Sequence, residues 1–211
     1  MILSQQEIEE ANQRLRGAAP TDIIRWAVGL GSSTIASTSF GVHAGALLQM
    51  IAQTTPKLPI IWVDSGYNLA DTYRVADSLT QTFQLNLQVY SPAMTAERRN
   101  AIRGGIPTLD EAERHANFTR EVKLEPFERA LAEYRPKVWI SGIRREETEY
   151  RKSLDIVSLD SRGILKVAPL FYWTEQQVKS YMREHSIPSC QHYFDPTKVL
   201  SGRECGLHTA A

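Results

Sequence analysis

Leu58-Pro59-Ile60-Ile61-Trp62-Val63 reads as a buried β-strand, and Asp64-Ser65-Gly66-Tyr67 after it reads as a turn. An apolar run of this length, closed by a glycine-containing turn, is typical of a strand covered on both faces. Residues 69–83 follow as a predicted helix, and residues 85–90 alternate between apolar and polar side chains as a strand does. This segment is therefore predicted to form a βαβ unit, which implies parallel strands in one sheet.

The same alternation of strands and helices extends to both sides of this unit. It predicts an α/β fold, with a doubly wound, mostly parallel sheet and helices on both faces. Residues 91–122 are polar and weakly periodic, and we expect irregular structure with one or two short helices there. The other expected elements are a helix opened by the capping box Ser4-Gln5-Gln6-Glu7, helices at 21–28, 42–52, 125–134 and 174–185, and strands at 33–37, 138–141, 154–159 and 164–167.

The bulk composition excludes several classes of protein. A length of 211 residues suits one domain, and 42% hydrophobic residues are enough for a sizeable core. Lysine plus arginine and aspartate plus glutamate number 24 each, so there is no basic excess of the kind that nucleic-acid and membrane-surface binders carry. The N-terminus turns polar at once and no apolar run could span a bilayer, so we expect a cytoplasmic protein.

The chain has 2 cysteines, Cys190 and Cys205. This number falls short of the usual thiolate complement of an iron–sulfur cluster, so we expect no metal and no bound cofactor. Cys205 is unusual because it lies near the end of the chain, between Arg203 and His208. Neighbouring cations favour the thiolate, which is the nucleophilic form, although Glu204 opposes them. The plain alternative is an inert thiol on a frayed tail.

A candidate anion-binding loop lies between the strand at 33–37 and the helix at 42–52. Its sequence is Ser37-Thr38-Ser39-Phe40-Gly41. A helix N-terminus offers unpaired N–H groups and the positive end of the helix dipole, and the hydroxyls add further donors. The loop lacks the lysine of a Walker loop, so it is no ordinary ATPase loop. The plain alternative is an ordinary connection with a helix cap.

Two further polar segments follow predicted strands, where ligands bind in open parallel sheets. The first is the turn Asp64-Ser65-Gly66, which on its own is as well explained by a turn that needs its glycine. The second is Gly142-Ile143-Arg144-Arg145-Glu146. Adjacent arginines point to different sides of an extended backbone, and a guanidinium matches phosphate or sulfate oxygens with paired donors. The alternative there is a surface charge pair of little energetic value.

Taken in order, four of these segments resemble motifs of the phosphoadenylyl-sulfate (PAPS) reductase family. They are Ser37–Gly41, similar to its modified PP-loop; Asp64–Tyr67; Gly142–Glu146; and Glu204-Cys205-Gly206-Leu207-His208, similar to its terminal signature. The resemblance runs from about Ile23 to His208 and implies a PP-loop fold of the adenine nucleotide alpha hydrolase type and a homodimer. It also implies that Cys205 is catalytic and that the substrate is contacted by Ser37, Thr38, Ser39, Phe40, Gly41, Asp64, Ser65, Gly66, Lys123, Arg144, Arg145, Arg151, Lys166 and His208.

The activity that the resemblance implies is reduction of PAPS to sulfite and adenosine 3′,5′-bisphosphate in assimilatory sulfate reduction. Reduced thioredoxin, or glutaredoxin, would be the electron donor, and Cys205 would carry a sulfonate in between. The sister family, the adenylyl-sulfate (APS) reductases, holds a cluster with a Cys-Cys pair and a Cys-x-x-Cys motif, which are missing here. The alternatives are such an APS reductase, or a nucleotide-binding relative whose reductase activity is lost or altered.

We expect one domain over 1–211, with N-terminal helices at 1–30, an α/β core at 31–185 and a mobile catalytic tail at 186–211. In the tail the sequence departs from the family, which usually has a longer segment with a Gly-Tyr-x-Ser-x-Gly-Asp-x-His core. Residues 190–202 fill that space here. Tyr193 and Phe194 are apolar enough to anchor this segment, and Pro196 restricts its conformations. We therefore expect a docked hinge and a competent but slow reductase.

Overall fold

The computed structural model describes residues 3–108, 110–198 and 207. Within these residues, six strands form one sheet in the order β3-β2-β1-β4-β6-β5. All neighbouring strands are parallel except β5 and β6, which are antiparallel. The strands are β1 Thr34–Thr38, β2 Ile60–Val63, β3 Leu87–Tyr90, β4 Val138–Ile140, β5 Val157–Leu159 and β6 Leu165–Val167.

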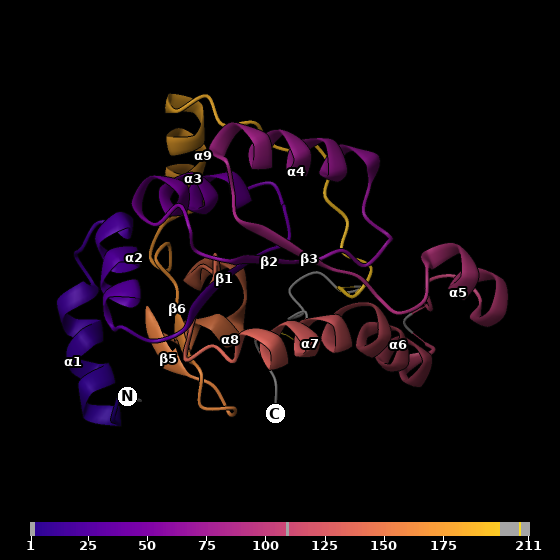
Figure 1. The fold of residues 1–211 in the computed structure, drawn as a ribbon, viewed down its shortest axis with the longest axis horizontal. Helices are drawn as coiled ribbons and strands as arrows, with labels where there is room; N and C mark the ends of the chain where they lie inside the picture. The colour runs from indigo at the N-terminus through magenta and orange to yellow at the C-terminus, as the bar shows by residue number, and fades with distance from the viewer. Residues whose placement is uncertain (1–2, 109, 199–206, 208–211) are drawn as a thin grey trace.

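The helices are α1 Gln5–Leu15, α2 Pro20–Gly29, α3 Ala44–Thr54, α4 Ala70–Phe83, α5 Ala96–Arg103, α6 Ala112–Thr119, α7 Glu125–Tyr134, α8 Glu149–Lys152 and α9 Glu175–Glu184. A π-helical turn, η1 Arg120–Leu124, joins α6 to α7, and a 3₁₀ turn, η2 Arg145–Glu147, precedes α8. Figure 1 shows α3 and α4 on one face of the sheet and α7 on the other. In the described part of the chain, no helix is long and apolar enough to cross a membrane.

The core has two parts because side chains alternate between the two faces of each strand. Ile35, Ile61 and Trp139 point toward α7 and pack with its apolar side. Ala36 and Ile60, their neighbours in sequence, point to the opposite face and join the larger cluster built by α1 to α4 and α9. Strands buried on both faces explain why their sequences are continuously apolar. The predicted α/β fold with helices on both faces is confirmed.

Two predicted helix starts are also confirmed. The Ser4 hydroxyl accepts a hydrogen bond from the Glu7 backbone N–H, and the Glu7 carboxylate accepts one in return from the Ser4 backbone. Thr174 forms the same reciprocal arrangement with Gln177 at the start of α9. Each box satisfies N–H groups that a helix end otherwise leaves unpaired, which is why the sequence signature works.

The expectation for residues 91–122 was only partly correct. Two helices, α5 and α6, form as expected, but the chain then continues as helix through η1 into α7 instead of remaining irregular. Arg99 organises this region: it is 5% exposed, donates to Glu121 and to the Gly104 and Gly105 carbonyls, and lies 4.4 Å from the Phe118 ring centroid. A charged residue that is buried in an ion pair adds nothing to the apolar periodicity of the sequence, so periodicity alone could not reveal this helical region.

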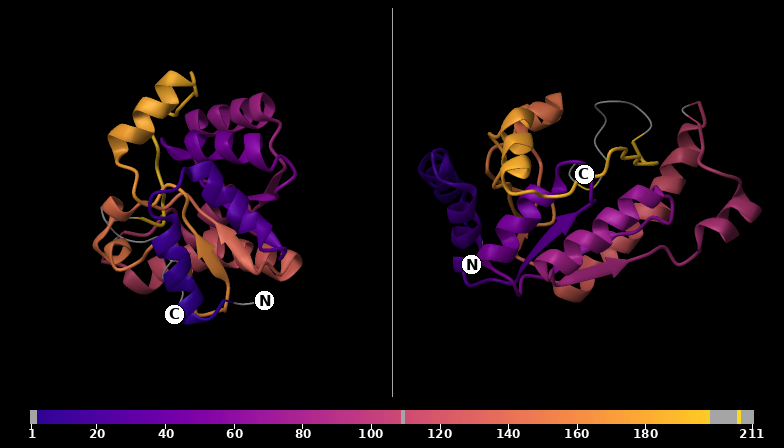
Figure 2. Two further views of the ribbon diagram at one scale, coloured as in Figure 1. Left: turned by 90° about the vertical axis from the view of Figure 1, so that its left-hand side faces the viewer. Right: turned by 90° about the horizontal axis from the view of Figure 1, so that it is seen from above.

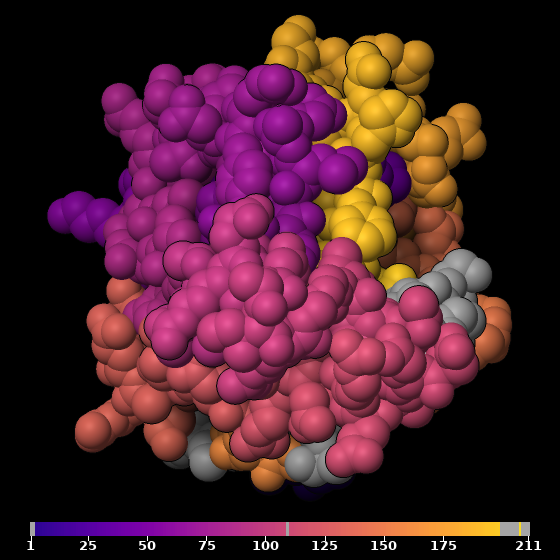
Figure 3. All heavy atoms as spheres, turned by 90° about the vertical axis from the view of Figure 1, so that its right-hand side faces the viewer, coloured from indigo at the N-terminus to yellow at the C-terminus, as the bar shows by residue number. Residues whose placement is uncertain are grey.

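The connections at β1 and β4 place a ligand site at the carboxyl ends of these strands. The chain leaves β1 into α3 on one face, whereas it reaches the neighbouring strand β4 from α7 on the other face (Figure 2). Such a topological switch point opens a crevice at the carboxyl edge of the sheet. Residues 187–198, here called the hinge, cross this edge after α9. Figure 3 shows the hinge, in yellow, between the purple α3–α4 layer and the pink α5–α6 segment.

Candidate active site

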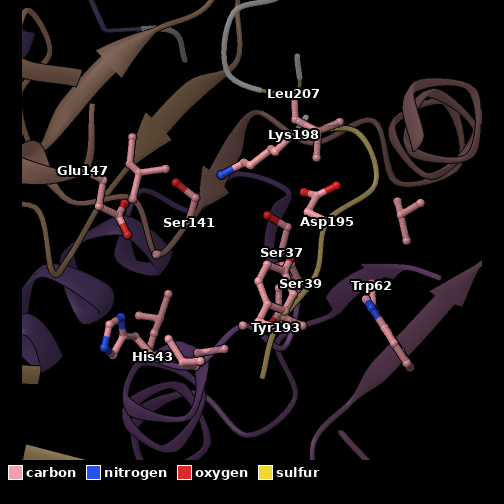
Figure 4. Close-up of a pocket in the computed structure, with 18 of the residues that line it drawn as sticks. Ser37, Ser39, His43, Trp62, Ser141, Glu147, Tyr193, Asp195, Lys198 and Leu207 are labelled. Atoms are coloured by element: carbon pink, nitrogen blue, oxygen red, sulfur yellow. The ribbon is translucent and has the colours of Figure 1, made fainter. Parts of the chain in front are cut away.

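A cavity of about 340 Å³ lies at the carboxyl ends of β1, β2 and β4 (Figure 4). Its walls come from the loop after β1, the N-terminus of α3, the η1 turn, the segment after β4 and the hinge. A cavity of this size is at the lower end of the range for small-molecule sites. Its position at the switch point is where doubly wound folds bind nucleotides.

The end of β1 and the loop after it supply Ser37, Thr38, Ser39 and Gly41 to the cavity wall. The Ser37 hydroxyl accepts a hydrogen bond from the Trp139 ring N–H at 2.8 Å, and the Thr38 hydroxyl accepts one from the Phe40 backbone at 3.1 Å. These bonds fix the loop. Among the described residues, no side chain caps the N-terminus of α3, which begins at the cavity, so the unpaired N–H groups of its first turn and its dipole favour an anion there.

Phe40 differs from its neighbours in this loop. Its side chain is completely buried against Trp62, with ring centroids 4.9 Å apart, and it does not line the cavity. Its φ of 50° is the left-handed conformation that a bulky side chain rarely adopts. The buried side chain of Phe40 therefore anchors the loop after β1.

The turn after β2 is held by the carboxylate of Asp64. Its Oδ1 accepts from the Gly66 backbone N–H at 3.0 Å, from Asn68 Nδ2 at 2.9 Å and from the Tyr73 hydroxyl at 2.8 Å. Burial and this carboxylate raise the pKa of Tyr73 to about 12. Ser65 and Asn68 line the cavity, whereas Asp64 and Gly66 shape the turn from behind.

The segment after β4 contributes a network of charges in which the arginines are buried and the glutamates are partly exposed. Arg144 is 4% exposed and donates to Glu146 at 3.0 Å and to Glu147 at 3.2 Å. Arg151, 5% exposed, donates to the other oxygen of Glu147. Glu147 therefore bridges two arginines, and all three side chains line the cavity. Two of the three predicted arginines, Arg144 and Arg151, come together at the cavity, and both have carboxylate partners.

His43 is a fourth member of this group, at the start of α3. Its Nδ1 lies 3.4 Å from an Arg144 guanidinium nitrogen, and its Nε2 lies 3.8 Å from a Glu175 carboxylate oxygen. Burial, and then the Arg144 charge, lower the pKa of His43. The neutral ring can accept the Arg144 hydrogen bond at Nδ1, so His43 helps to hold Arg144 beside the cavity.

Lys123 faces the cavity from the η1 turn. Its ammonium pairs with Asp195 and donates to the Thr197 hydroxyl at 3.1 Å, so it holds the hinge against the core. Asp195 is largely buried, which by itself would raise its pKa, but Lys123 and the Thr197 bonds bring the pKa below its usual value. A π-helical turn inside a longer helix is a common feature of functional sites, and here it places Lys123 at the cavity.

Three other residues singled out from the sequence do not line the cavity. Arg145 is exposed, and its guanidinium lies 6.0 Å from the Tyr172 ring centroid. Lys166 is buried on β6, with its ammonium 5.2 Å from the Trp139 ring centroid, and it does not line the cavity either. Phe194 is 43% exposed, so it does not anchor the hinge. Tyr193 does line the cavity.

The hinge is docked by polar contacts in place of Phe194. Cys190, 3% exposed, lies with its sulfur 3.5 Å from the Phe40 carbonyl oxygen, and burial raises the pKa of its thiol. The Gln191 backbone N–H donates to Asp71 at 2.8 Å. The Pro196 carbonyl lies 3.3 Å from the His115 ring nitrogen. The expected docked hinge is present over residues 187–198.

Sequence reasoning did not single out several polar residues that line the cavity, among them His43, Ser141 and Lys198. Ser141 ends a predicted strand, so the rule that located the arginines could have found it. His43 follows the anion loop directly and could have been expected at the helix start. Lys198 lies in a segment without any period, and nothing in its local sequence marks it.

Cys205 and His208 lie outside the described residues. Leu207, which belongs to the same terminal signature, is described, and it lines the cavity and packs near the core cluster of α7. Among the described residues, no three His, Cys, Asp or Glu side chains are grouped closely enough to hold a metal ion.

Comparison with known proteins agrees with this geometry. The phosphoadenosine phosphosulfate reductase domain family matches residues 33–200. A phosphoadenosine 5′-phosphosulfate reductase from Synechococcus sp. is 36% identical over 182 residues, covering 86% of this chain and 78% of that protein. A reductase of the same name from Thiocapsa roseopersicina is 33% identical over 226 residues, covering 95% of this chain and 93% of that protein.

Solved structures give the same result. A Candida auris PAPS reductase in complex with phosphate superimposes with a TM-score of 0.80 at 28% identity, over 90% of this chain and 91% of that one. A Candida glabrata FMN adenylyltransferase in complex with ATP gives a TM-score of 0.58 at 15% identity, which shows a shared fold alone. With the switch-point cavity and the match over residues 33–200, the chain belongs to the phosphoadenosine phosphosulfate reductase family.

Proposed function

We propose that this chain reduces PAPS to sulfite and adenosine 3′,5′-bisphosphate, with thioredoxin as the electron donor. The observation that carries the proposal is the cavity at the switch point. It combines the hydroxyl-rich loop Ser37–Ser39, the uncapped N-terminus of α3 and several cationic side chains. All of these groups favour a ligand with several negative charges. The family membership supplies the substrate class.

In the proposed first step, the Cys205 thiolate attacks the sulfur of the substrate. The bond from sulfur to the bridging phosphate oxygen breaks, and adenosine 3′,5′-bisphosphate leaves with that electron pair. Negative charge grows on the leaving phosphate, and preorganised donors at that position lower the barrier. The donors available in the cavity are the Ser37 to Ser39 loop and the N-terminus of α3.

In the second step, a thiolate of reduced thioredoxin attacks the Cys205 sulfur. Sulfite leaves with the electron pair of the sulfur–sulfur bond, and a mixed disulfide remains. The second thioredoxin thiol then attacks the thioredoxin sulfur of the mixed disulfide. This step closes the thioredoxin disulfide and releases Cys205 as a thiolate. Glutaredoxin can supply the same pair of thiols. We further propose a cytoplasmic homodimer in which the tail of one subunit reaches toward the site of its partner.

Sulfite release from PAPS with reduced thioredoxin tests the proposal directly. Cys205→Ser is expected to abolish sulfite formation and to keep nucleotide binding, because the thiol is needed for chemistry alone. Cys190→Ser is the matched control: its sulfur packs against the Phe40 carbonyl, so most of the activity is expected to remain. Sulfite production by the Cys205→Ser protein would contradict the mechanism.

The same assay separates the two alternatives. A preference for adenylyl sulfate over PAPS, together with stoichiometric iron in the purified protein, would assign the chain to the APS reductases. Tight binding of adenosine 3′,5′-bisphosphate without any sulfonated Cys205 in mass spectra would assign it to nucleotide-binding relatives that have lost turnover. Under our proposal, the sulfonate appears on mixing with PAPS alone and disappears when thioredoxin is added.

A further inference from the structure

Ser141 and Lys198 line the cavity with side-chain donors that have no hydrogen-bond partner among the described residues. Ser141, directly after β4, is 2% exposed, and its hydroxyl makes no hydrogen bond. Its backbone N–H is satisfied by the Val167 carbonyl at 3.0 Å, so the hydroxyl alone is left over. A buried polar group without a partner costs free energy, and such a group beside a cavity calls for a ligand.

Lys198 is the second unpartnered donor. Four cationic side chains line the cavity: Lys123, Arg144, Arg151 and Lys198. Lys123 pairs with Asp195, and the two arginines share Glu147. Within the described part of the chain, the Lys198 ammonium makes no ion pair and no hydrogen bond. Its positive charge is therefore not neutralised by the protein residues described.

The backbone that carries Lys198 is fixed. Its N–H donates to the Asp195 carbonyl at 3.0 Å, and the Asp195 carboxylate accepts from the Thr197 backbone at 3.0 Å and from the Thr197 hydroxyl at 2.6 Å. The ion pair with Lys123 ties this turn to the core. Figure 4 shows the Lys198 side chain extending into the cavity, with its ammonium directed to the side on which Ser141 lies.

We propose that the Ser141 hydroxyl and the Lys198 ammonium form an oxyanion subsite that binds a phosphate or sulfate group of the nucleotide. The inference deepens the proposed function and rests on it for the identity of the nucleotide. Lys198 belongs to the hinge, so the hinge itself contributes a specificity residue. Ser141 directly follows β4 of the sheet and Lys198 belongs to the hinge. An oxyanion bound by both residues therefore links the hinge to the sheet.

Calorimetric titration with adenosine 3′,5′-bisphosphate and with AMP tests the subsite. Lys198→Met is expected to weaken bisphosphate binding about tenfold to 100-fold, as for the loss of one charge-assisted contact. Lys198→Arg keeps the charge and is expected to stay within about threefold of the wild type. Lys57→Met is the matched control, because Lys57 is exposed at the opposite edge of the sheet, before β2.

The two nucleotides identify which group is bound. If Lys198→Met weakens the binding of the bisphosphate but not of AMP, the subsite holds the 3′-phosphate. If it weakens the binding of both nucleotides, the subsite lies at the 5′ side. Either result supports the subsite. Bisphosphate affinity that is unchanged in Lys198→Met would overturn it.

Ser141→Ala gives a readout that a purely structural serine would not give. Removing an unpaired buried hydroxyl is expected to leave the stability of the free protein unchanged or raised, while nucleotide binding weakens about fivefold to tenfold. A serine that only supports the fold would show reduced stability of the free protein instead. That result, with unchanged affinity, would contradict our assignment.

If the wild type binds neither nucleotide, the proposed function fails, and inorganic sulfate then tests the subsite by itself. Sulfate is expected to raise the melting temperature of the wild type, and Lys198→Met is expected to abolish the rise while Lys57→Met keeps it. An equal rise in all three proteins would overturn the subsite. Failure of the function and failure of the subsite therefore give different results.

Discussion

At the scale of single residues, most charges of the site are compensated by a neighbouring charge, and Lys198 is the exception among the described residues. The arginines of the segment after β4 could be anticipated from the sequence, but their carboxylate partners could not. Glu147 accepts from both Arg144 and Arg151, and Asp195, 72 positions away from Lys123, neutralises that lysine. Sequence patterns identify a charged residue but not its partner, because partners are brought together only by the fold.

The bridging role of Glu147 can be tested by removing its charge. Glu147→Gln leaves Arg151 without this partner, while Arg144 keeps Glu146. Breaking a fully buried pair costs roughly 3–5 kcal/mol; since the Glu147 side chain is 32% exposed, we expect a loss of about 2 kcal/mol in the free energy of unfolding. Glu149→Gln is the control: its side chain is 87% exposed, and urea denaturation should change by less than about 0.5 kcal/mol. Equal effects of the two substitutions would contradict the bridge.

The environment of His43 predicts how stability depends on pH. Burial and Arg144, with Lys179 nearby, lower its pKa from 6.5, against the opposing effect of Glu175 and Glu146. The unfolded chain therefore takes up this proton at a higher pH than the folded protein does. The stability that comes from keeping His43 neutral in the folded protein is complete above about pH 6.5, and it is lost as the pH falls below that value.

We therefore expect the free energy of unfolding to decrease between pH 7 and pH 5.5. His43→Asn, which keeps an acceptor near the Nδ1 position without a titrating ring, should flatten this decrease. His192→Asn is the control, because His192 is an exposed side chain of the hinge. Denaturation curves at several pH values measure the effect, and an unchanged slope in His43→Asn would refute it.

At the scale of elements, helices and strands with regular apolar patterns could be predicted from the sequence. Segments whose buried residues are charged and ion-paired could not. The apolar strands, such as β2, and the capped helices α1 and α9 form where the sequence predicts them. The helices α6 and α7 were expected, but their continuation into each other through η1 was missed, because Arg99 and Lys123 are buried by ion pairing and leave no apolar stripe. The hinge was expected to dock through Tyr193 and Phe194; Tyr193 lines the cavity, whereas Phe194 is exposed and polar contacts add to the docking.

The packing of α3 against the start of the hinge gives an element-scale prediction. A Cβ at Gly45 would lie 2.5 Å from Ile187 Cγ2, so Gly45→Ala forces this contact apart. Overpacking typically costs about 1–3 kcal/mol, which exceeds the roughly 1 kcal/mol that alanine gains over glycine in a helix. We expect a net loss of stability and faster hydrogen exchange in the hinge.

Gly29 in α2 is the matched control for this substitution. A Cβ there meets nothing within 4 Å, so Gly29→Ala should be neutral or stabilising by up to about 1 kcal/mol. Thermal denaturation of the two variants compares them directly. If Gly45→Ala were as stable as Gly29→Ala, α3 and the hinge would not be tightly packed.

At the scale of the whole molecule, the fold class could be predicted but the strand order could not. Alternating strands and helices indicate a parallel sheet, and this holds for five of the six strands in the described part of the chain. The order β3-β2-β1-β4-β6-β5 depends on which edge each connection crosses, and local patterns carry no such information. The switch point, and with it the cavity, follows from this order.

A ligand in this cavity contacts the sheet, α3 and the hinge at once, so it should stabilise the molecule as one unit. Adenosine 3′,5′-bisphosphate at 100 times its dissociation constant adds about 2.7 kcal/mol to the free energy of unfolding. For a chain of this length, that corresponds to a rise of roughly 5–11 °C in melting temperature. Calorimetry should show a single transition that moves upward, and Asp195→Asn should reduce the rise because the hinge loses its ion pair with Lys123. A second transition that stays in place as nucleotide is added would mean that the hinge and the sheet unfold separately and that the ligand does not join them.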